Sequence, residues 1–107
     1  MDLRVQKVIA FLQAHPTETF RVADLADQVN VSPWHLSHLF LTEIRMPPTV
    51  FSRRLKFEQA TRLLAETFLS VKEVMAAVGI HDKSHFAKEF RRLYGMSPTE
   101  YRRRHQR

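Results

Sequence analysis

The chain repeats itself at an interval of about fifty residues, and this duplication limits the folds open to it more than any other feature. Leu25 and Val29 align with Val74 and Val78 at a shift of 49 residues. One residue is then inserted, and a shift of 50 aligns Ser32/Asp82, His35/His85, Leu36/Phe86, Phe40/Phe90, Met46/Met96, Pro48/Pro98, Phe51/Tyr101 and Arg53/Arg103. Because apolar, capping and proline positions keep one order in both copies, each copy is expected to form the same small unit.

The first copy carries the signals of two short helices joined by a tight turn. An apolar-periodic segment runs from Val22 to Val29 and ends at Asn30, a residue type that tolerates the left-handed conformation. Ser32 is a natural N-cap, and Pro33 suits the first position of the helix that follows. These signals predict a helix-turn-helix at about 22–44.

The second copy repeats this plan at about 71–94. Ser70 to Glu73 has the pattern of a capping box that opens a short helix, and Gly79 supplies the turn. Asp82 caps the next helix, and Gly95 ends it. The stretch Ser97 to Glu100 is read as another capping box, which opens a final helix at about 98–105.

Two further helices complete an expected all-α fold of seven helices. One runs from Leu3 to Ala14, and the other joins the copies without a break from Pro48 to about Glu66, a length of roughly 28 Å. One domain is expected over residues 1–107. The expected core positions are Val5, Val8, Ile9, Leu12, Leu25, Ala26, Val29, Leu36, Leu39, Phe40, Phe51, Leu55, Leu63, Leu64, Val74, Ala77, Val78, Phe86, Phe90, Leu93 and Tyr101.

Composition narrows the class of function. Lys and Arg outnumber Asp and Glu by 17 to 11, which gives a formal charge of +6 and favours a polyanionic partner. The sequence has no cysteine, so disulfides, thiol nucleophiles and Cys-based zinc sites are excluded. The longest apolar run, Val8 to Leu12, is too short for a signal core or a membrane span. A cytoplasmic, nucleoid-associated protein is expected.

In a helix-turn-helix, the second helix enters the major groove of DNA while the first crosses the backbone. The outward faces of the two second helices therefore hold the candidate base-reading residues, which are Trp34, Ser37, His38, Lys83, Ser84, His85 and Lys88. The joining helix approaches the 34 Å rise of one DNA turn. The candidate phosphate contacts are Arg53, Arg54, Lys56, Arg91 and Arg92, with the run Arg102–Arg104 as a further candidate.

Each of these residues also has a simpler interpretation. Trp34 can pack against a neighbouring helix, and His38, Lys83 and Lys88 can be ordinary surface residues. His35 and His85 flank the core stripe, so a packed or backbone-bonded histidine is as good an expectation as a DNA contact. A basic run near a chain end, such as Arg102–Arg104, is often a solvated tail.

These motifs together resemble the DNA-binding domain of the AraC/XylS family of bacterial transcription regulators. The likeness extends from about residue 3 to residue 104. Its most specific stretches are Ser32-Pro33-Trp34-His35-Leu36 with Phe40, and Gly79-Ile80 through Phe86, Phe90, Gly95-Met96-Ser97-Pro98 and Tyr101-Arg102. The resemblance implies two helix-turn-helix subdomains and activation or repression near promoters, often through contact with RNA polymerase. It also matches the seven candidate base-reading residues to reading positions of that family.

Several positions depart from the family pattern. His38, Lys56 and Lys88 stand where arginines are common, and lysine cannot form the fork of an arginine. Asn30 and Arg45 stand in place of glycines. Arg21 occupies the position of an expected Ser or Thr N-cap. These departures predict a first copy that is less rigid or less discriminating than the second.

The sequence alone leaves several other functions to be weighed. His35/His38 and His81/His85 have the spacing of paired metal ligands, although no third ligand is evident. The chain has no phosphate-binding glycine loop and no catalytic grouping, so no enzyme and no cofactor are expected. A basic helical module for protein partners or anionic surfaces remains the main alternative. RNA fits less well, because its major groove is narrow. The favoured hypothesis is a monomeric reader of a bipartite site on double-stranded DNA.

Overall fold

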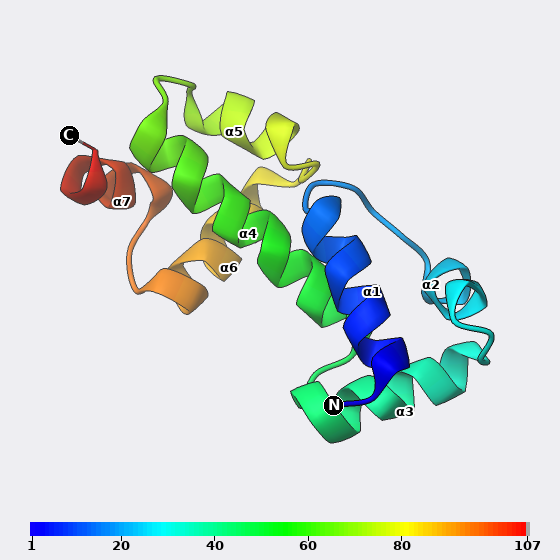
Figure 1. The fold of residues 1–107 in the computed structure, drawn as a ribbon. Coiled ribbons are helices and arrows are strands. Elements are labelled where there is room, and N and C mark those ends of the chain that lie inside the picture. Colours follow the sequence, from blue (N-terminus) through cyan, green and yellow to red (C-terminus); the bar gives the residue numbers. More distant parts are fainter. Residues whose placement is uncertain (107) are drawn as a thin grey trace. The chain divides into compact units, whose positions relative to one another are not determined.

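The computed structural model describes residues 1–106, and within them the chain forms seven α-helices and no strand (Figure 1). The expected all-α class with seven helices is confirmed. The expected domain of 1–107 includes Arg107, which lies outside the described residues. The helices are α1 (Leu3–Ala14), α2 (Val22–Gln28), α3 (Pro33–Ile44), α4 (Pro48–Glu66), α5 (Val71–Ala77), α6 (Lys83–Tyr94) and α7 (Pro98–His105).

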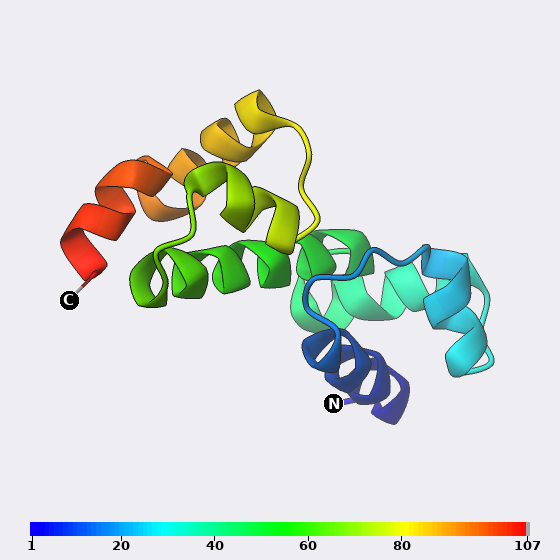
Figure 2. The ribbon, with the colours of Figure 1, turned by 90° about the horizontal axis from the view of Figure 1, so that it is seen from above.

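The chain divides into two compact units, Met1–Leu55 and a second that begins at Lys56. The first unit contains α1, α2, α3 and the start of α4, and these helices enclose a core of their own (blue to green in Figure 2). The buried side chains of this core are Val5, Val8, Leu12, Leu25, Ala26, Leu36 and Phe40, with Phe51 and Leu55 of α4 packed against them. The apolar stripes expected for α1, α2 and α3 therefore face inward.

The second unit has a core rich in aromatic rings. Figures 1 and 2 show α5, α6 and α7 around the second part of α4. Phe57 of α4 stacks on Phe86 of α6, with ring centroids 5.4 Å apart and planes within 11°. Phe90 lies 5.7 Å from Phe86 and meets Tyr101 of α7 edge to face at 5.6 Å. Offset and edge-to-face pairs of this kind stabilise a core beyond their buried area.

Two core expectations for this unit need correction. On α5, the expected core residue Ala77 is exposed, and Met75 is buried instead, because the helix turns its Val74–Met75 edge toward the aromatic rings. On α4, Phe57 and Ala60 are fully buried, although the sequence analysis did not place them in the core. The apolar residues of α4 follow two stripes, because this helix contributes to two separate cores.

The duplication expected from the sequence is present in the structure. Helices α2 and α5 are both 7 residues long, and α3 and α6 are both 12 residues long. The starts of α2 and α5 differ by 49 residues, whereas those of α3 and α6, and of α4 and α7, differ by 50. The alternation of buried and exposed residues over 41–50 is repeated residue by residue over 91–100. Each copy is therefore the same helix-turn-helix unit.

Four residues with positive φ end the helices of the two copies. Asn30 (φ 58°) follows α2, and Gly79 (φ 76°) occupies the corresponding turn after α5. Arg45 (φ 69°) and Gly95 (φ 74°) end α3 and α6 in the left-handed conformation. Because a Cβ makes this conformation unfavourable for most L-residues, Arg45 is the most strained of the four.

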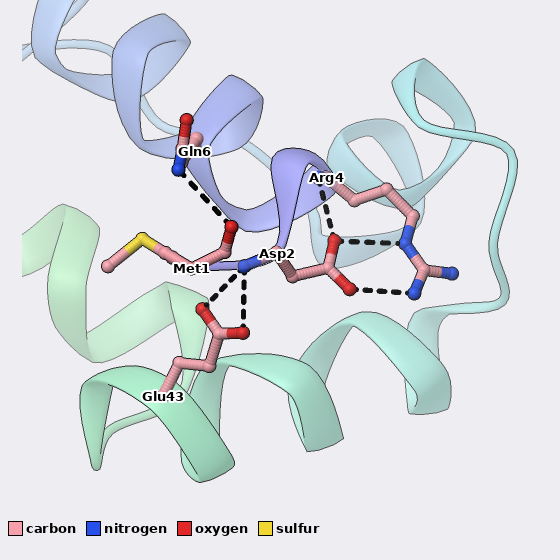
Figure 3. Close-up of polar contacts among 5 residues, drawn as sticks. All are labelled: Met1, Asp2, Arg4, Gln6 and Glu43. Atoms are coloured by element: carbon pink, nitrogen blue, oxygen red, sulfur yellow. Dashed lines mark hydrogen bonds and ion pairs between the residues drawn. The ribbon is translucent and has the colours of Figure 1, made fainter.

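The N-terminus of the first unit is fixed against the last turn of α3 (Figure 3). The backbone N–H of Asp2 donates to both carboxylate oxygens of Glu43, at 2.9 and 3.1 Å. The Asp2 side chain caps α1 by accepting from the Arg4 N–H at 2.8 Å, and its carboxylate also pairs with the Arg4 guanidinium. This hydrogen-bonded pair lowers the pKa of Asp2 to about 2. The hydrogen bonds to Glu43 thereby link the start of the chain to the last turn of α3.

Candidate nucleic-acid interface

The first turn of α3 is set by its cap. The Ser32 hydroxyl accepts a hydrogen bond from the His35 N–H at 3.0 Å, and Pro33 occupies the first helical position. Leu36 and Phe40 are buried, so their stripe fixes the rotation of α3 about its axis. The side chains of Trp34 and His38 consequently lie on the outward face.

Trp34 and His38 form a stacked pair on this outward face. Trp34 is 72% exposed, so it is not packed into the space between neighbouring helices. Its ring lies 4.9 Å from the His38 ring, and the two planes are within 14° of each other. His38 is exposed, whereas Ser37 and His35 are half-buried beside the pair. The first copy therefore presents a flat aromatic surface and no cation on α3.

Helix α6 buries the corresponding face in the core of its own unit, but its exposed side chains differ in chemistry. The Asp82 carboxylate caps it by accepting from the His85 N–H at 3.0 Å, and Phe86 and Phe90 hold the opposite face in the core. Its exposed polar and charged residues are Lys83, Ser84, His85, Lys88, Arg91 and Arg92. The second copy therefore presents a cationic surface at the place where the first copy presents aromatic rings.

The two arginines at the end of α6 differ in their local partners. The Arg92 guanidinium pairs with the Glu89 carboxylate one turn back, and its Nε donates to Glu89 at 3.1 Å. This hydrogen bond raises the pKa of Arg92 above its ordinary value. The i,i+3 pair draws Arg92 back along its own helix, so Arg91 is the better placed of the two to reach an external anion.

Lys56 was expected to contact phosphate from the surface of α4, but it is buried. The residue is only 8% exposed, and burial lowers the pKa of its ammonium group. A cation that is enclosed by the protein has little surface left for a phosphate group. Arg53 and Arg54, the other two expected phosphate contacts on α4, are exposed.

Arg102 has a structural role that the sequence analysis missed. Its Nε donates to the carbonyl of Leu64 at 3.1 Å, and its Nη2 donates to the carbonyls of Thr67 and Leu69. The Leu64 carbonyl belongs to the last turn of α4, where helices leave carbonyl groups without intrahelical donors and where a positive charge is favourable, and the carbonyls of Thr67 and Leu69 lie in the segment that follows. The Arg102–Arg104 run is thus divided, because Arg103 and Arg104 are exposed while Arg102 is half-buried.

The expected capping boxes are confirmed in one case and corrected in the other. At α5, the Ser70 hydroxyl accepts from the Glu73 N–H, and the Glu73 carboxylate accepts from the Ser70 N–H at 2.9 Å. These backbone and side-chain hydrogen bonds lower the pKa of Glu73. At α7, the Ser97 hydroxyl accepts from the Glu100 N–H at 3.1 Å, but the described residues lack the reciprocal bond. Ser97 is a simple N-cap.

The paired histidines of the sequence do not gather further ligands. Within residues 1–106, the structure brings together no group of three or more His, Asp or Glu side chains that could hold a metal ion. None of the helices in the same range has the length and apolar character of a membrane-spanning helix.

Sequence comparison connects this arrangement to known regulators. A family of helix-turn-helix domains matches residues 25–104. The arabinose operon regulatory protein of Escherichia coli is 31% identical over 103 residues, which are 95% of this chain and 35% of that protein. The transcriptional regulator GbdR of Pseudomonas aeruginosa is 30% identical over 99 residues, which are 92% of this chain and 27% of that protein. The chain spans about a third of the length of the curated relatives it matches.

Solved structures agree with the sequence comparison. The C-terminal domain of the response regulator AraT from Geobacillus stearothermophilus has a TM-score of 0.87 at 26% identity, covering 99% of this chain and 88% of that one. The DNA-binding domain of AdpA, solved with a target DNA, has a TM-score of 0.82 at 30% identity, covering 92% of this chain and 88% of that one. The chain therefore belongs to the AraC/XylS family of helix-turn-helix transcription regulators, which is not a family of enzymes.

Proposed function

We propose that this chain is a sequence-specific regulator of transcription that binds double-stranded DNA with α3 and α6 in successive major grooves. The observation that carries the proposal is the repeated geometry of the two helices. Each is the second helix of a helix-turn-helix, each is capped at its first turn, and each buries two large residues while its opposite face is exposed. The exposed face of such a helix is the part that reads base edges.

In this proposal, each copy reads bases with the outward residues near the start of its second helix. For α3 these residues are Trp34, Ser37 and His38, and for α6 they are Lys83, Ser84, His85 and Lys88. Lysine donates to the O6 and N7 acceptors of guanine, while serine and histidine hydrogen-bond to several base edges. Support for these assignments comes from the exposure of Trp34, His38, Lys83, Ser84, His85 and Lys88, and from partial exposure of Ser37.

Phosphate contacts are assigned to the exposed arginines Arg53, Arg54 and Arg91. They supply affinity without sequence information, because phosphates are the same at every step of the duplex. Arg92 contributes less, since it is paired with Glu89. Lys56 and Arg102 are left out, because the first is buried and the second holds the end of α4.

The proposal also covers the stoichiometry of the complex with DNA and the access to RNA polymerase. One copy of the chain binds one bipartite, non-palindromic site, since the two halves of a single chain present different residues to the two half-sites. Binding beside a promoter then brings RNA polymerase within reach, as the family resemblance implies. Sedimentation of the chain with a single duplex tests the first part, with a one-to-one complex as the expected result.

The experiment that tests the main proposal is in-vitro selection of randomised duplex DNA at roughly physiological salt, followed by sequencing of the bound fraction. We expect enrichment of two short segments about one helical turn apart. In a second measurement, Arg53→Ala should weaken binding to enriched and random duplexes by a similar factor. A failure to enrich any sequence, together with binding to anionic lipid vesicles, would favour the basic-module alternative instead.

A further inference from the structure

The stacked pair on α3 has no counterpart in the second copy. At a shift of 50 residues, Trp34 corresponds to Ser84 and His38 to Lys88, and both positions have the same place in helices of equal length. The rings of Trp34 and His38 are nearly parallel at 4.9 Å. The stack is therefore not a requirement of the fold, because the second copy forms the same helix without it.

The stack also does little for the core of the first unit. Within residues 1–106, Trp34 is the third most exposed large apolar residue, after Phe68 and Leu3, and His38 is exposed beside it. Among the described residues, the structure gives the His38 ring nitrogens no hydrogen-bond partner, whereas the His38 carbonyl accepts from the Thr42 hydroxyl. The ring edge of His38 is thus available to a ligand, while one ring face is covered by Trp34.

We infer that Trp34 is a positioning residue for His38, and that the stacked His38 ring reads a purine N7 at one position of the first half-site. This inference rests on the proposed function. The residues are four apart on one helix, so their side chains lie on the same face and the indole restricts rotation of the imidazole. A side chain that is already oriented loses less entropy when it binds, and it reads a base with more directional precision.

The choice of a purine follows from the donor and acceptor pattern of the major groove. An imidazole N–H held in one orientation makes one hydrogen bond, so it needs one acceptor in a fixed place. Guanine and adenine both present N7 there, whereas cytosine presents an N4 amino donor. A single donor consequently separates purine from cytosine without separating the two purines. The guanidinium fork of an arginine would instead engage both O6 and N7 of guanine.

The test uses the site enriched by selection with the full chain. Dissociation constants are measured for duplexes that carry each of the four bases at every position of the first half-site. At one position we expect a preference for either purine over cytosine on the order of fivefold, the usual effect of one hydrogen bond. Substituting 7-deazaguanine, which lacks the N7 acceptor, should remove this preference. His38→Ala should remove the same preference and make the protein insensitive to 7-deazaguanine.

The positioning role is tested at the same DNA position. Trp34→Phe keeps a ring plane and should retain most of the preference, whereas Trp34→Leu should lose it even though His38 is still present. The side chains of Trp34 and His38 are both exposed, so the melting temperature of each Trp34 variant should stay within about 2 °C of the parent. Lys88→Ala is the matched control from the second copy. It should weaken binding by a similar factor whichever base stands at this position, so the ratio of affinities between the bases should stay the same.

The results that overturn the inference are distinct from failure of the proposed function. A purine preference that survives His38→Ala removes His38 from the reading role. A full preference in Trp34→Leu removes the positioning role of Trp34. If the parent chain enriches no sequence at all, the proposed function itself fails, and the inference fails with it.

Discussion

The two helix-turn-helix copies have equal helix lengths and similar buried stripes, but they differ at their helix ends. In the first copy, α2 begins after Arg21, which makes no side-chain cap, and α3 ends at Arg45 in the left-handed conformation. In the second copy, Ser70 takes part in a capping box, and Gly95 supplies the left-handed residue. The shared apolar stripe therefore specifies the same fold in both copies, while the residues at the helix ends change the stability of each copy.

The copies also differ on their exposed faces. Helix α3 has no lysine or arginine and presents the stacked rings of Trp34 and His38, whereas α6 has two lysines and two arginines. The same backbone geometry therefore carries two different kinds of recognition surface. The proposed function assigns directional contacts with base edges to the first surface, and both base contacts and attraction to the charged backbone to the second.

The largest difference in stability should come from Arg102, which corresponds to Ser52 in the first copy. Arg102→Ala leaves carbonyls at the end of α4 without their charged donor, so we expect the free energy of unfolding to fall by about 2 kcal/mol. Ser52→Ala is the matched control and should change it by less than about 0.5 kcal/mol. Urea unfolding measures both. Equal effects would mean that Arg102 does not distinguish the copies.

The exposed faces should differ in their response to salt. Lys88→Ala should lower the affinity for the selected duplex about tenfold and reduce the slope of log affinity against log salt by about 1, because a cation is lost. His38→Ala, at the corresponding position of the first copy, should leave that slope unchanged, because no lysine or arginine is removed. Binding titrations from 50 to about 200 mM salt provide the comparison. The same change of slope for both variants would contradict it.

Substitutions of the two residues that end α3 and α6 in the left-handed conformation should change the free energy of unfolding in opposite directions. Arg45→Gly should raise the free energy of unfolding by somewhat less than about 1 kcal/mol, since relief of strain exceeds the added freedom of the unfolded chain. Gly95→Ala should lower it by about 1 kcal/mol. A Cβ at Gly95 would have no atom within 4 Å, so this cost is conformational rather than steric. Thermal unfolding of the two variants tests the pair, and a stabilising Gly95→Ala would refute the account of this turn.

A smaller contrast is expected at the starts of α2 and α5. Arg21→Ser introduces a hydroxyl that can cap α2, and it should stabilise the protein by about 0.5 kcal/mol. Ser70→Ala removes the cap of α5 and should destabilise it by about 1 kcal/mol. If Arg21→Ser has no effect while Ser70→Ala does, the start of α2 is stabilised by its surroundings rather than by a cap.

The smallest expected effect is a difference in acid sensitivity. The pKa of Glu73 is lowered in the folded protein, so its contribution to stability is present above the ordinary pKa of 4.5 and is lost as pH falls through the folded value. Glu73→Gln should therefore flatten the loss of stability below about pH 4.5. Asp24→Asn is the control at the corresponding position of the first copy. Acid titrations that coincide for Glu73→Gln and the parent would exclude this role of the capping box.

The sequence predicted the helix bounds well because its signals are local. Proline, serine and aspartate mark helix starts, and the four residues with positive φ are types or positions expected at turns. The exchange of Met75 for Ala77 in the core was not predictable in this way. Both residues fit the apolar pattern of a seven-residue helix, and only the packing around Phe57 and Phe86 decides which edge of α5 turns inward.

The candidate interface was predicted less completely, because side-chain partners depend on distant parts of the chain. Lys56 follows exposed Arg53 and Arg54 on the same helix, but it is buried at the point of α4 where the second unit begins. Arg102 lies 38 residues from Leu64, whose carbonyl it binds. One available signal was the end of α4 itself, which leaves carbonyls that require a donor. The stack of Trp34 on His38 was also accessible from the i,i+4 spacing.

The measurement that tests the two different recognition surfaces most directly is a repeat of the DNA selection with one surface removed at a time. The first variant combines Trp34→Leu with His38→Ala, and the second combines Lys83→Ala with Lys88→Ala. The account predicts that each variant still enriches one segment and loses the other, and that the lost segment differs between them. Loss of the same segment by both variants, or retention of both segments by either one, would contradict the assignment of a separate recognition surface to each copy.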